Sequence, residues 1–393
     1  MTRRARRTHW AAIRCADGLF LDVESFLGGA IQVDREPELR AFSALNGAEH
    51  ELSRAELDVL LEFPVDEWRE SSNPLVAELE RKGLLVVEGS ESVGLDERLT
   101  AGQWNLFGAL YHARGRWSGV DLPLHSAPAA ELALGEQATA EFLERFGPPP
   151  PHFHSVPAPV ATLELPLVER AGGVFDALAR RQTSRTFDAE LSIGLEQLSL
   201  LLRTVFGAQA LAVMAQDAVG IRKTSPSGGG LHPIEAYPLV CKADGVESGF
   251  HHYHVGDHSL ELVEPLAEEE ARALGVAFAS GQGYFREAAV HVVLTARFER
   301  SFWKYRRHEK AYGVTLMEVG HLGQSFYLVC AELGLGAFVT AAVNNADIDA
   351  RLGLDGFSEG ALAICGCGPL VTERPALQPP FRPYRPPREP ALP

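Results

Sequence analysis

The chain has few cysteines and no long apolar run. Its 393 residues contain five cysteines, an odd and scattered set that argues against a disulfide framework. Cys365 and Cys367 lie close together, but two thiols without further ligands nearby are a weak metal signal. We therefore expect buried, reduced cysteines in a cytoplasmic protein. No apolar stretch is long enough to span a bilayer, and no apolar signal segment follows the basic residues Arg3 to Arg7.

Positive charge is scarce as well. The net charge of −16 argues against general nucleic-acid binding, which needs a basic surface, although a local basic groove for an acidic ligand or peptide remains compatible with it. The sequence contains no internal repeat and no Rossmann fingerprint. A hydrophobic content of 46% and a charged content of 22% are ordinary for a soluble globular protein of two or three domains.

Composition and turn signals divide the chain into segments. We predict a small module over 1–90, a connecting helical region with a proline-rich linker over 91–160, an α+β domain over 161–370, and a proline-rich tail over 371–393. The tail is expected to be polyproline II or disordered, because proline recurs in it at short intervals.

The N-terminal module has the pattern of a winged helix-turn-helix. The spacing Ser53-x-x-Glu56 is that of a capping box, so a helix is expected to begin there. A second helix is predicted from Asn73-Pro74 to Lys82-Gly83, followed by a short strand from Leu84 to Val87. Upstream, Cys15 to Phe26 is strand-like, with a turn expected at Asp17-Gly18.

The larger domain mixes helices and strands without a βαβ repeat, which favours an α+β fold. The predicted elements are an amphipathic helix over Leu198–Phe206, a hairpin over Phe250–Glu264, a strand over Ala289–Ala296, a long apolar helix over Thr315–Leu333 and a strand over Leu362–Cys365. Gly320 and Gly323 on the long helix would allow close packing, as at a subunit interface.

A glycine-rich loop, Ser225 to Pro233, precedes the strand-like run Ile234 to Val240. Three successive glycines let the backbone approach a flat ligand, because no Cβ stands in the way. The loop's N–H groups could stabilise negative charge on a reduced ring. By itself, the loop fits a plain surface turn equally well.

A second segment, Arg180 to Phe187, clusters guanidinium and hydroxyl groups. Arg181, Thr183 and Arg185 suit a phosphate and the polar edge of a ring system. The alternative is a solvated charge run at a helix end.

A third segment places Lys304 beside Tyr305. The pair offers a base and a hydrogen-bond donor, and burial beside a cofactor would lower the lysine pKa toward neutrality. The alternative is an exposed basic patch, because Arg306 and Arg307 follow at once. His321, on the apolar helix, is predicted to be a hydrogen-bonded core residue and not a catalyst. Together the three segments indicate a bound flavin.

Four histidines, at 251, 252, 254 and 258, resemble a metal cluster only at first sight. In a strand, His252 and His254 share one face while His251 points away, and His258 lies beyond the turn. We therefore predict a polar hairpin and no metal site.

Taken together, these segments resemble the nitroreductase-like flavoproteins, and within them the SagB-type dehydrogenases of ribosomal-peptide maturation. The resemblance covers about residues 100 to 370. The matching motifs are Arg181-x-Thr183-x-Arg185-x-Phe187, Pro226-Ser227-Gly228-Gly229-Gly230-x-x-Pro233, Tyr253-His254, Lys304-Tyr305 and Glu318-x-Gly320-His321-x-x-Gln324. The resemblance implies a central, mainly antiparallel sheet flanked by helices, and an FMN-binding homodimer with the flavin at the subunit interface.

The resemblance also implies site residues. Lys304 and Tyr305 match the catalytic pair of azoline-oxidising members. The residues implied to bind FMN are Arg181, Thr183, Arg185, Pro226, Ser227, Gly228, Gly229 and Gln324. Two positions depart from the family pattern: Tyr312-Gly313 stands where a second Tyr-Arg pair is frequent, and Ser325 stands where Asn is usual.

The N-terminal module resembles the winged-helix domains that bind leader peptides of such precursors. The sequence therefore predicts an FMN-dependent dehydrogenase that oxidises an azoline to an azole in a ribosomally made peptide, with a cyclodehydratase as a possible partner. Two alternatives stay open. One is an NAD(P)H-dependent reductase of dehydroamino acids or of small nitro or quinone compounds; the other is a non-catalytic scaffold subunit.

Overall fold

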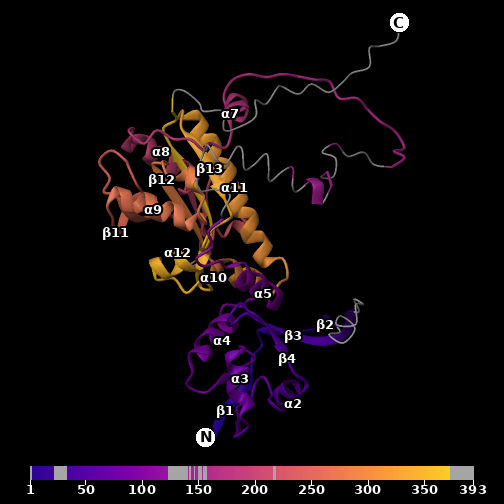
Figure 1. Ribbon diagram of the computed structural model, residues 1–393. Helices are drawn as coiled ribbons and strands as arrows, with labels where there is room; N and C mark the ends of the chain where they lie inside the picture. Colours follow the sequence, from indigo (N-terminus) through magenta and orange to yellow (C-terminus); the bar gives the residue numbers. More distant parts are fainter. Residues whose placement is uncertain are drawn as a thin grey trace.

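The computed structural model describes residues 2–21, 33–122, 157–215 and 218–371, with a few single positions between 140 and 153. The predicted proline-rich tail and most of the predicted linker lie outside these residues. The described chain forms a small N-terminal unit and a larger α+β unit (Figure 1). Among the described helices, none is both long and apolar enough to cross a membrane.

The N-terminal unit combines a three-stranded sheet with two helices. Strand β1 (Arg3–Arg7) pairs antiparallel with β5 (Arg69–Ser71) and β6 (Leu85–Val87), and α2 (Arg54–Glu62) and α3 (Leu75–Arg81) pack beside it. The predicted capping box is confirmed: the Ser53 hydroxyl accepts from the Glu56 backbone N–H at 3.2 Å, and the Glu56 carboxylate accepts from the Ser53 N–H at 2.8 Å.

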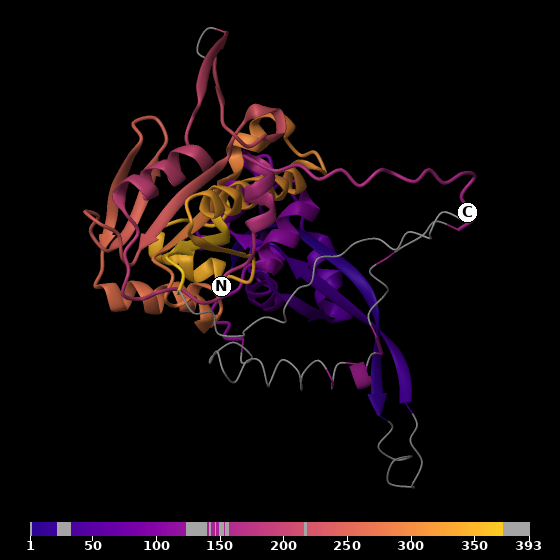
Figure 2. The same cartoon turned by 90° about the horizontal axis from the view of Figure 1, so that it is seen from above.

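A long hairpin projects from this unit (Figure 2). It is formed by β2 (Ala11–Leu21) and β3 (Val33–Ser43), and β4 (Glu49–Leu52) extends its sheet. The predicted turn at Asp17-Gly18 is wrong, because both residues lie inside β2 and pair with Pro37 and Glu36. The ladder continues through the Asp-Gly pair, so long-range pairing overrides the local turn preference.

Two helices connect the units, α4 (Glu91–Ala101) and α5 (Leu106–Gly115). Trp104, between them, is 1% exposed and donates from its indole nitrogen to the Phe357 carbonyl at 3.2 Å. Trp10 of the N-terminal unit belongs to the same apolar core as Trp104. This core therefore couples the connecting helices to the larger unit.

The larger unit is built on a six-stranded, fully antiparallel sheet, which confirms the predicted fold class. The strand order is β11-β10-β9-β12-β14-β13. Their bounds are β9 Ile234–Val240, β10 Gly249–His254, β11 Ser259–Pro265, β12 Val290–Arg297, β13 Gly336–Thr340 and β14 Glu359–Gly368. The predicted strand Ile234–Val240, the hairpin Phe250–Glu264 and the strands Ala289–Ala296 and Leu362–Cys365 thus correspond to β9, β10–β11, β12 and β14.

Helices cover both faces of this sheet (Figure 1). Along β12, Val292 and Leu294 join the core under α8 and α11, while Val293 joins the core under α9 and α12, as the two-residue period of a strand requires. The helices are α7 Val174–Arg180, α8 Leu195–Val205, α9 Glu268–Phe278, α10 Phe298–Tyr305, α11 Ala311–Glu332 and α12 Asn345–Leu352, with a β7–β8 hairpin over Ala210–Ala215 and Ala218–Arg222 and short 3-10 turns η2 Gly228–Gly230 and η3 Gly283–Phe285.

The two glycines of α11 have different surroundings. A Cβ at Gly323 would lie 3.4 Å from Val339, so this glycine lets α11 pack closely on β13 within the chain. Gly320 is exposed and has no neighbour within 4 Å of a Cβ. Of the predicted pair, only Gly320 is therefore available to another subunit. The cysteines are unbridged; four are buried as expected, whereas Cys15 is exposed.

Candidate functional site

The glycine-rich loop enters β9 through the η2 turn. Gly229 and Gly230 have φ of 66° and 68°. Residues with a Cβ adopt this left-handed backbone conformation only at a cost in conformational energy. The Gly230 N–H donates to the Ser227 carbonyl at 3.0 Å and closes the turn. A Cβ at Gly230 would meet no atom within 4 Å, so this part of the loop presents bare backbone to open space.

Ser227 ties the loop to α11. Its hydroxyl donates to the Glu318 carboxylate and accepts from the His232 backbone N–H at 2.9 Å. Glu318 is 2% exposed, and one of its oxygens has no hydrogen-bond partner among the described residues and lies 3.7 Å from His232 Nδ1. A buried carboxylate is costly unless it is hydrogen-bonded, so the Ser227 hydroxyl is an important partner.

Two further contacts hold the loop on the same helix. The His321 ring donates from Nδ1 to the Pro226 carbonyl at 3.1 Å, and the hydroxyls of Ser225 and Ser325 lie 2.7 Å apart. His321 is hydrogen-bonded as predicted, but it is half-buried and not a core residue. Ser325, one of the departures from the family pattern, thus has a role in anchoring the loop.

Lys223 is a site residue that the sequence argument missed. It lies three positions before Pro226 and is 7% exposed. Burial lowers the pKa of this lysine, although the carboxylates of Glu235 and Glu318 oppose the shift. A lysine immediately before a glycine loop was the available signal, but nothing in the sequence shows that it is buried.

Lys304 and Tyr305, at the C-terminal end of α10, meet the glycine loop. A Cβ at Gly229 would lie 2.9 Å from Lys304 Nζ and 3.1 Å from the Tyr305 hydroxyl. The Lys304 side chain is exposed, as the alternative of a basic patch expects, and Tyr305 is half-buried. The structure therefore brings the Lys304-Tyr305 pair to the loop, from which it is more than seventy positions away in the sequence.

An aromatic cluster fixes α10 in this position. The Trp104 ring centroid lies 4.8 Å from those of both Phe298 and Phe302, which are buried on α10. His112 is hydrogen-bonded to the Tyr312 hydroxyl at 3.0 Å, and burial raises the pKa of Tyr312. Tyr312, the other departure from the family pattern, therefore belongs to the structural cluster behind α10.

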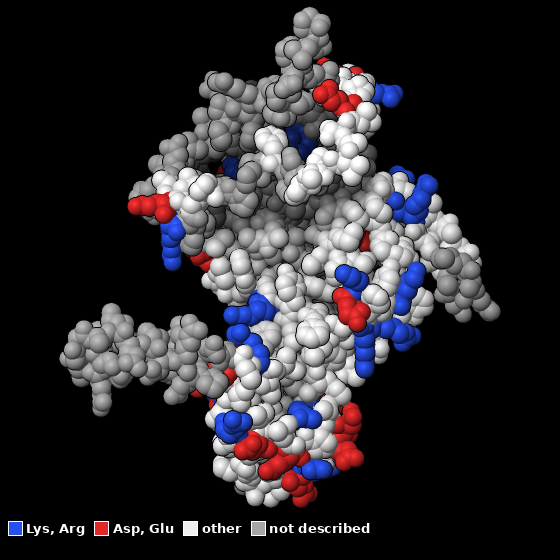
Figure 3. Space-filling view, turned by 90° about the vertical axis from the view of Figure 1, so that its right-hand side faces the viewer, with Lys and Arg blue, Asp and Glu red and all other residues white. Residues whose placement is uncertain are grey.

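A cavity of about 1040 Å³ opens beside the loop and α10. Gly229, Gly230, Arg300, Trp303 and Lys304 contribute to its wall. On the face seen in Figure 3, Lys and Arg side chains gather at the height of α5 and α10, and many of the Asp and Glu side chains gather on the N-terminal unit. The cavity has space for a ligand larger than a single ring, in direct contact with a lysine.

The arginine-rich segment lies at the other end of α11. The Arg181 guanidinium is 5.4 Å from the Tyr327 ring centroid, and the Thr183 hydroxyl is 2.9 Å from the Tyr327 hydroxyl. Arg185 instead lies 5.5 Å from the ring centroid of Tyr284. Arg181 and Thr183 are thus brought together, and Arg185 is directed to a different ring.

An FMN bound here would have to bridge two clusters. Glu318, under the glycine loop, and Tyr327, beside Arg181, are about 14 Å apart along the axis of α11. Gln324 is exposed on the helix between them. An elongate ligand with a flat ring at one end and a phosphate at the other fits bare glycine backbone at one cluster and guanidinium groups at the other.

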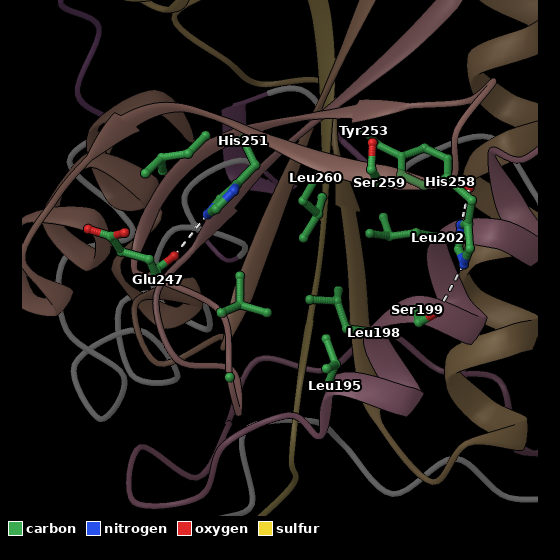
Figure 4. A pocket seen from close by; sticks show the side chains of 13 residues that line it. Leu195, Leu198, Ser199, Leu202, Glu247, His251, Tyr253, His258, Ser259 and Leu260 are labelled. Carbon is green, nitrogen blue, oxygen red and sulfur yellow. Dashed lines mark hydrogen bonds between the residues drawn. The ribbon is translucent and has the colours of Figure 1, made fainter.

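The four histidines of the hairpin have separate hydrogen-bond partners. His251 donates to the Glu247 carbonyl at 2.8 Å, and His258 is 3.0 Å from the Ser199 hydroxyl; both line a pocket of about 370 Å³ between α8 and the β10–β11 hairpin (Figure 4). His252 lies 2.7 Å from Glu261, on the other face of β10. Within the described ranges, no group of three or more His, Cys, Asp or Glu residues is arranged to hold a metal.

The fold and the site define an α+β domain with the nitroreductase architecture. The Nitroreductase family profile matches residues 178–368, and the chain belongs to this family of oxidoreductases. The nitroreductase-like protein MJ1384 of Methanocaldococcus jannaschii is 31% identical over 186 residues, which are 47% of this chain and 86% of that protein. The resemblance inferred from the five motifs is therefore confirmed.

Two further relatives are peptide-processing proteins by name. The trifolitoxin-processing protein TfxB of Rhizobium leguminosarum bv. trifolii is 33% identical over 176 residues, 44% of this chain and 46% of that protein. The microcin B17-processing protein McbC of Escherichia coli is 27% identical over 193 residues, 46% of this chain and 68% of that protein. The chain thus matches less than half of the length of TfxB.

Proposed function

We propose that the protein is an FMN-dependent dehydrogenase that matures a ribosomally synthesised peptide by oxidising an azoline to an azole. The observation that carries the proposal is the meeting of Lys304 and Tyr305 over Gly229, beside a cavity of about 1040 Å³. Similarity to two peptide-processing proteins, TfxB and McbC, supports a peptide as the substrate.

The chain's residues have separate tasks in this reaction. Lys304 is the base: its amine, in the deprotonated form, removes a proton from a ring carbon of the azoline. The Tyr305 hydroxyl donates a hydrogen bond that orients the amine or stabilises charge on the ring. Lys223 is not the base, because it is buried under the loop and does not line the cavity.

The cofactor is held by the residues around the loop and by the arginine-rich segment. Ser227, Gly228 and Gly229 would lie against the ring system, and Arg181 and Thr183 would hold the phosphate or the polar edge. When bound, FMN accepts the second hydrogen of the azoline as hydride, and dioxygen regenerates the oxidised flavin. The azoline would thus lose one proton to Lys304 and one hydride, which carries both electrons, to the flavin, and the lysine would then release its proton to solvent.

The decisive test is turnover by the Lys304→Ala variant. A synthetic peptide with one thiazoline is incubated with the flavin-loaded protein, and mass spectrometry follows the loss of two hydrogens. We expect Lys304→Ala to keep its flavin and to lose at least about a hundredfold in rate, the usual contribution of a general base. Lys310→Ala, a lysine at the start of α11 that does not line the cavity, is the matched control. An unchanged rate in Lys304→Ala would refute the assigned role.

The similarity to MJ1384, a nitroreductase by name, supports a second candidate function, that of an NAD(P)H-dependent reductase. Adding NADPH and then NADH without oxygen separates the two. Rapid bleaching of the flavin would favour the reductase, and a flavin that stays oxidised until the thiazoline peptide is added would favour the dehydrogenase. Protein that binds peptide but no flavin, even after reconstitution with FMN, would favour the scaffold.

The partners are proposed from the same resemblance. The N-terminal unit is proposed to hold the leader peptide, and a cyclodehydratase to supply the azoline. A homodimer is proposed through α11, where Leu316, Met317 and Gly320 are exposed on a largely apolar helix. Light scattering of wild type and Met317→Glu checks this, because a buried charge at the interface should produce monomer.

A further inference from the structure

The cavity beside Lys304 has a row of cations along one wall. Three basic side chains lie on one face of α10, because they are spaced by three and four residues: Arg297 at the N-cap, then Arg300 and Lys304. All three line the cavity. Arg306 also lines it. Such a row contrasts with a chain whose net charge is −16.

Most of these cations lack a carboxylate partner. Arg297 is paired with Glu235 at 3.1 Å. Arg300 donates from Nε to the Leu231 carbonyl at 2.7 Å, which leaves its terminal nitrogens to other partners. In the part of the chain that the structure describes, no carboxylate forms an ion pair with Arg300, Lys304 or Arg306. Arg300 and Arg306, on either side of Lys304, are therefore available to bind an anionic ligand.

The acidic residues of the wall cancel only part of this positive charge. Glu299 and Glu359 also line the cavity, and the Glu359 carboxylate accepts from the Thr295 hydroxyl at 2.6 Å, but these two carboxylates face four basic side chains, those of Arg297, Arg300, Lys304 and Arg306. Trp303, in the same wall, is 69% exposed. A large aromatic surface beside free cations favours a ligand that is both anionic and able to cover the ring.

The spacing of the charges distinguishes an extended peptide from a dinucleotide. Arg300 and Arg306 are about 9 Å apart along the axis of α10, and their side chains are long enough to converge. Side chains two positions apart in an extended chain lie on the same side, about 6.6 Å apart. The two phosphates of a dinucleotide are adjacent and do not need separated cations.

We propose that the cavity selects an extended substrate segment with acidic residues at alternate positions, on either side of the residue that carries the ring. One carboxylate pairs with Arg300 and the other with Arg306, so that Lys304, between them, stays free to act as the base. This inference rests on the proposed function for the identity of the substrate as a peptide.

Binding can be measured without turnover. Three pentapeptides with the same neutral fluorophore carry Glu-Cys-Glu, Gln-Cys-Gln or Lys-Cys-Lys between terminal glycines, and fluorescence anisotropy gives their Kd with the full-length, FMN-supplemented protein. We expect the glutamate peptide to bind about tenfold more tightly than the glutamine peptide, and the lysine peptide most weakly. High salt should remove the difference, since it screens charges at the surface.

Matched variants locate the effect. Arg300→Gln should remove most of the preference for glutamate, and Arg300→Lys should restore part of it, because the charge and not the fold is being tested. Arg307→Gln changes a neighbouring arginine that does not line the cavity and should keep the preference.

Three results would overturn the inference: equal binding of the glutamate and glutamine peptides, equal loss in Arg300→Gln and Arg307→Gln, or displacement of the glutamate peptide by NADPH with the same dependence on Arg300. Failure of the proposed function gives a different pattern. In that case glutamate peptides bind with the expected preference, but no azoline is oxidised. Oxidation without any charge preference would refute the inference alone.

Discussion

Replacing Ser227 by alanine tests how the glycine loop is held. The Ser227 hydroxyl donates to a carboxylate that is 2% exposed, that of Glu318, and accepts from the His232 N–H. In Ser227→Ala both groups lose this partner, and water has little access to the carboxylate. Ser225→Ala, two positions away, is the matched control, because Ser225 bonds to the neutral hydroxyl of Ser325.

The two substitutions should differ in cost. A hydrogen bond to a charged group contributes roughly 1.5–3 kcal/mol, and a neutral one about 1 kcal/mol. With the orphaned His232 N–H added, Ser227→Ala should lower the free energy of unfolding by about 3 kcal/mol, and Ser225→Ala by about 1 kcal/mol. For a domain of this size the corresponding falls in Tm are roughly 6–12 °C and 2–4 °C.

Differential scanning calorimetry of both variants measures these shifts. A third variant, Glu318→Gln, keeps an oxygen that accepts from Ser227 but removes the buried charge. In that background Ser227→Ala still orphans the His232 N–H and should cost about 2 kcal/mol, so the double-mutant cycle should show a coupling of about 1 kcal/mol. The reasoning is refuted if Ser227→Ala costs no more than Ser225→Ala, or if it costs the same with Glu and with Gln at position 318.

Two further predictions concern packing and pH. His291 is fully buried in β12, its ring nitrogens have no partner among the described residues, and burial lowers its pKa to about 4, so the unfolded chain takes up its proton first as the pH falls below about 6.5. The stabilisation that the neutral His291 contributes is complete above about pH 6.5 and is lost as the pH falls toward about 4, the pKa in the folded state. Between pH 7 and about pH 5, wild type should therefore lose about 2 kcal/mol more free energy of unfolding than His291→Leu, as measured by urea unfolding. Gly228→Ala should destabilise the loop, because the new Cβ would lie 2.0 Å from Val314 Cγ1. Val314→Ala should restore the Tm of that variant, and a double variant no more stable than Gly228→Ala would contradict the contact.

Most individual elements follow from local signals. The capping box at Ser53 and Glu56 and the alternation along β12 each reflect interactions within a few residues, or burial on one side of a strand. The turn predicted at Asp17-Gly18 was wrong because an interaction between distant residues overrides the local preference. Both residues pair with β3, which begins only at Val33.

The candidate site was only partly accessible to such reasoning. The chemistry of the glycine loop and of the Lys304-Tyr305 pair can be predicted from the sequence, because residue type alone determines which groups can donate, accept or carry charge. The burial of an individual side chain cannot be predicted in this way. The sequence left burial and exposure of Lys304 both open, and the structure shows it exposed, while Lys223, which the sequence argument did not single out, is the lysine that burial affects.

The sequence by itself determined the fold class, the family resemblance and the residue types of the site, because these depend on patterns and motifs of neighbouring residues. Only the tertiary structure decided that Lys304 meets Gly229, that Glu318 is buried beneath Ser227, and that the cations of α10 share a cavity. These facts depend on how α10 and α11 pack against the loop before β9. Packing of that kind is set by contacts between distant parts of the chain, such as Trp104 against α10, and no local pattern encodes them.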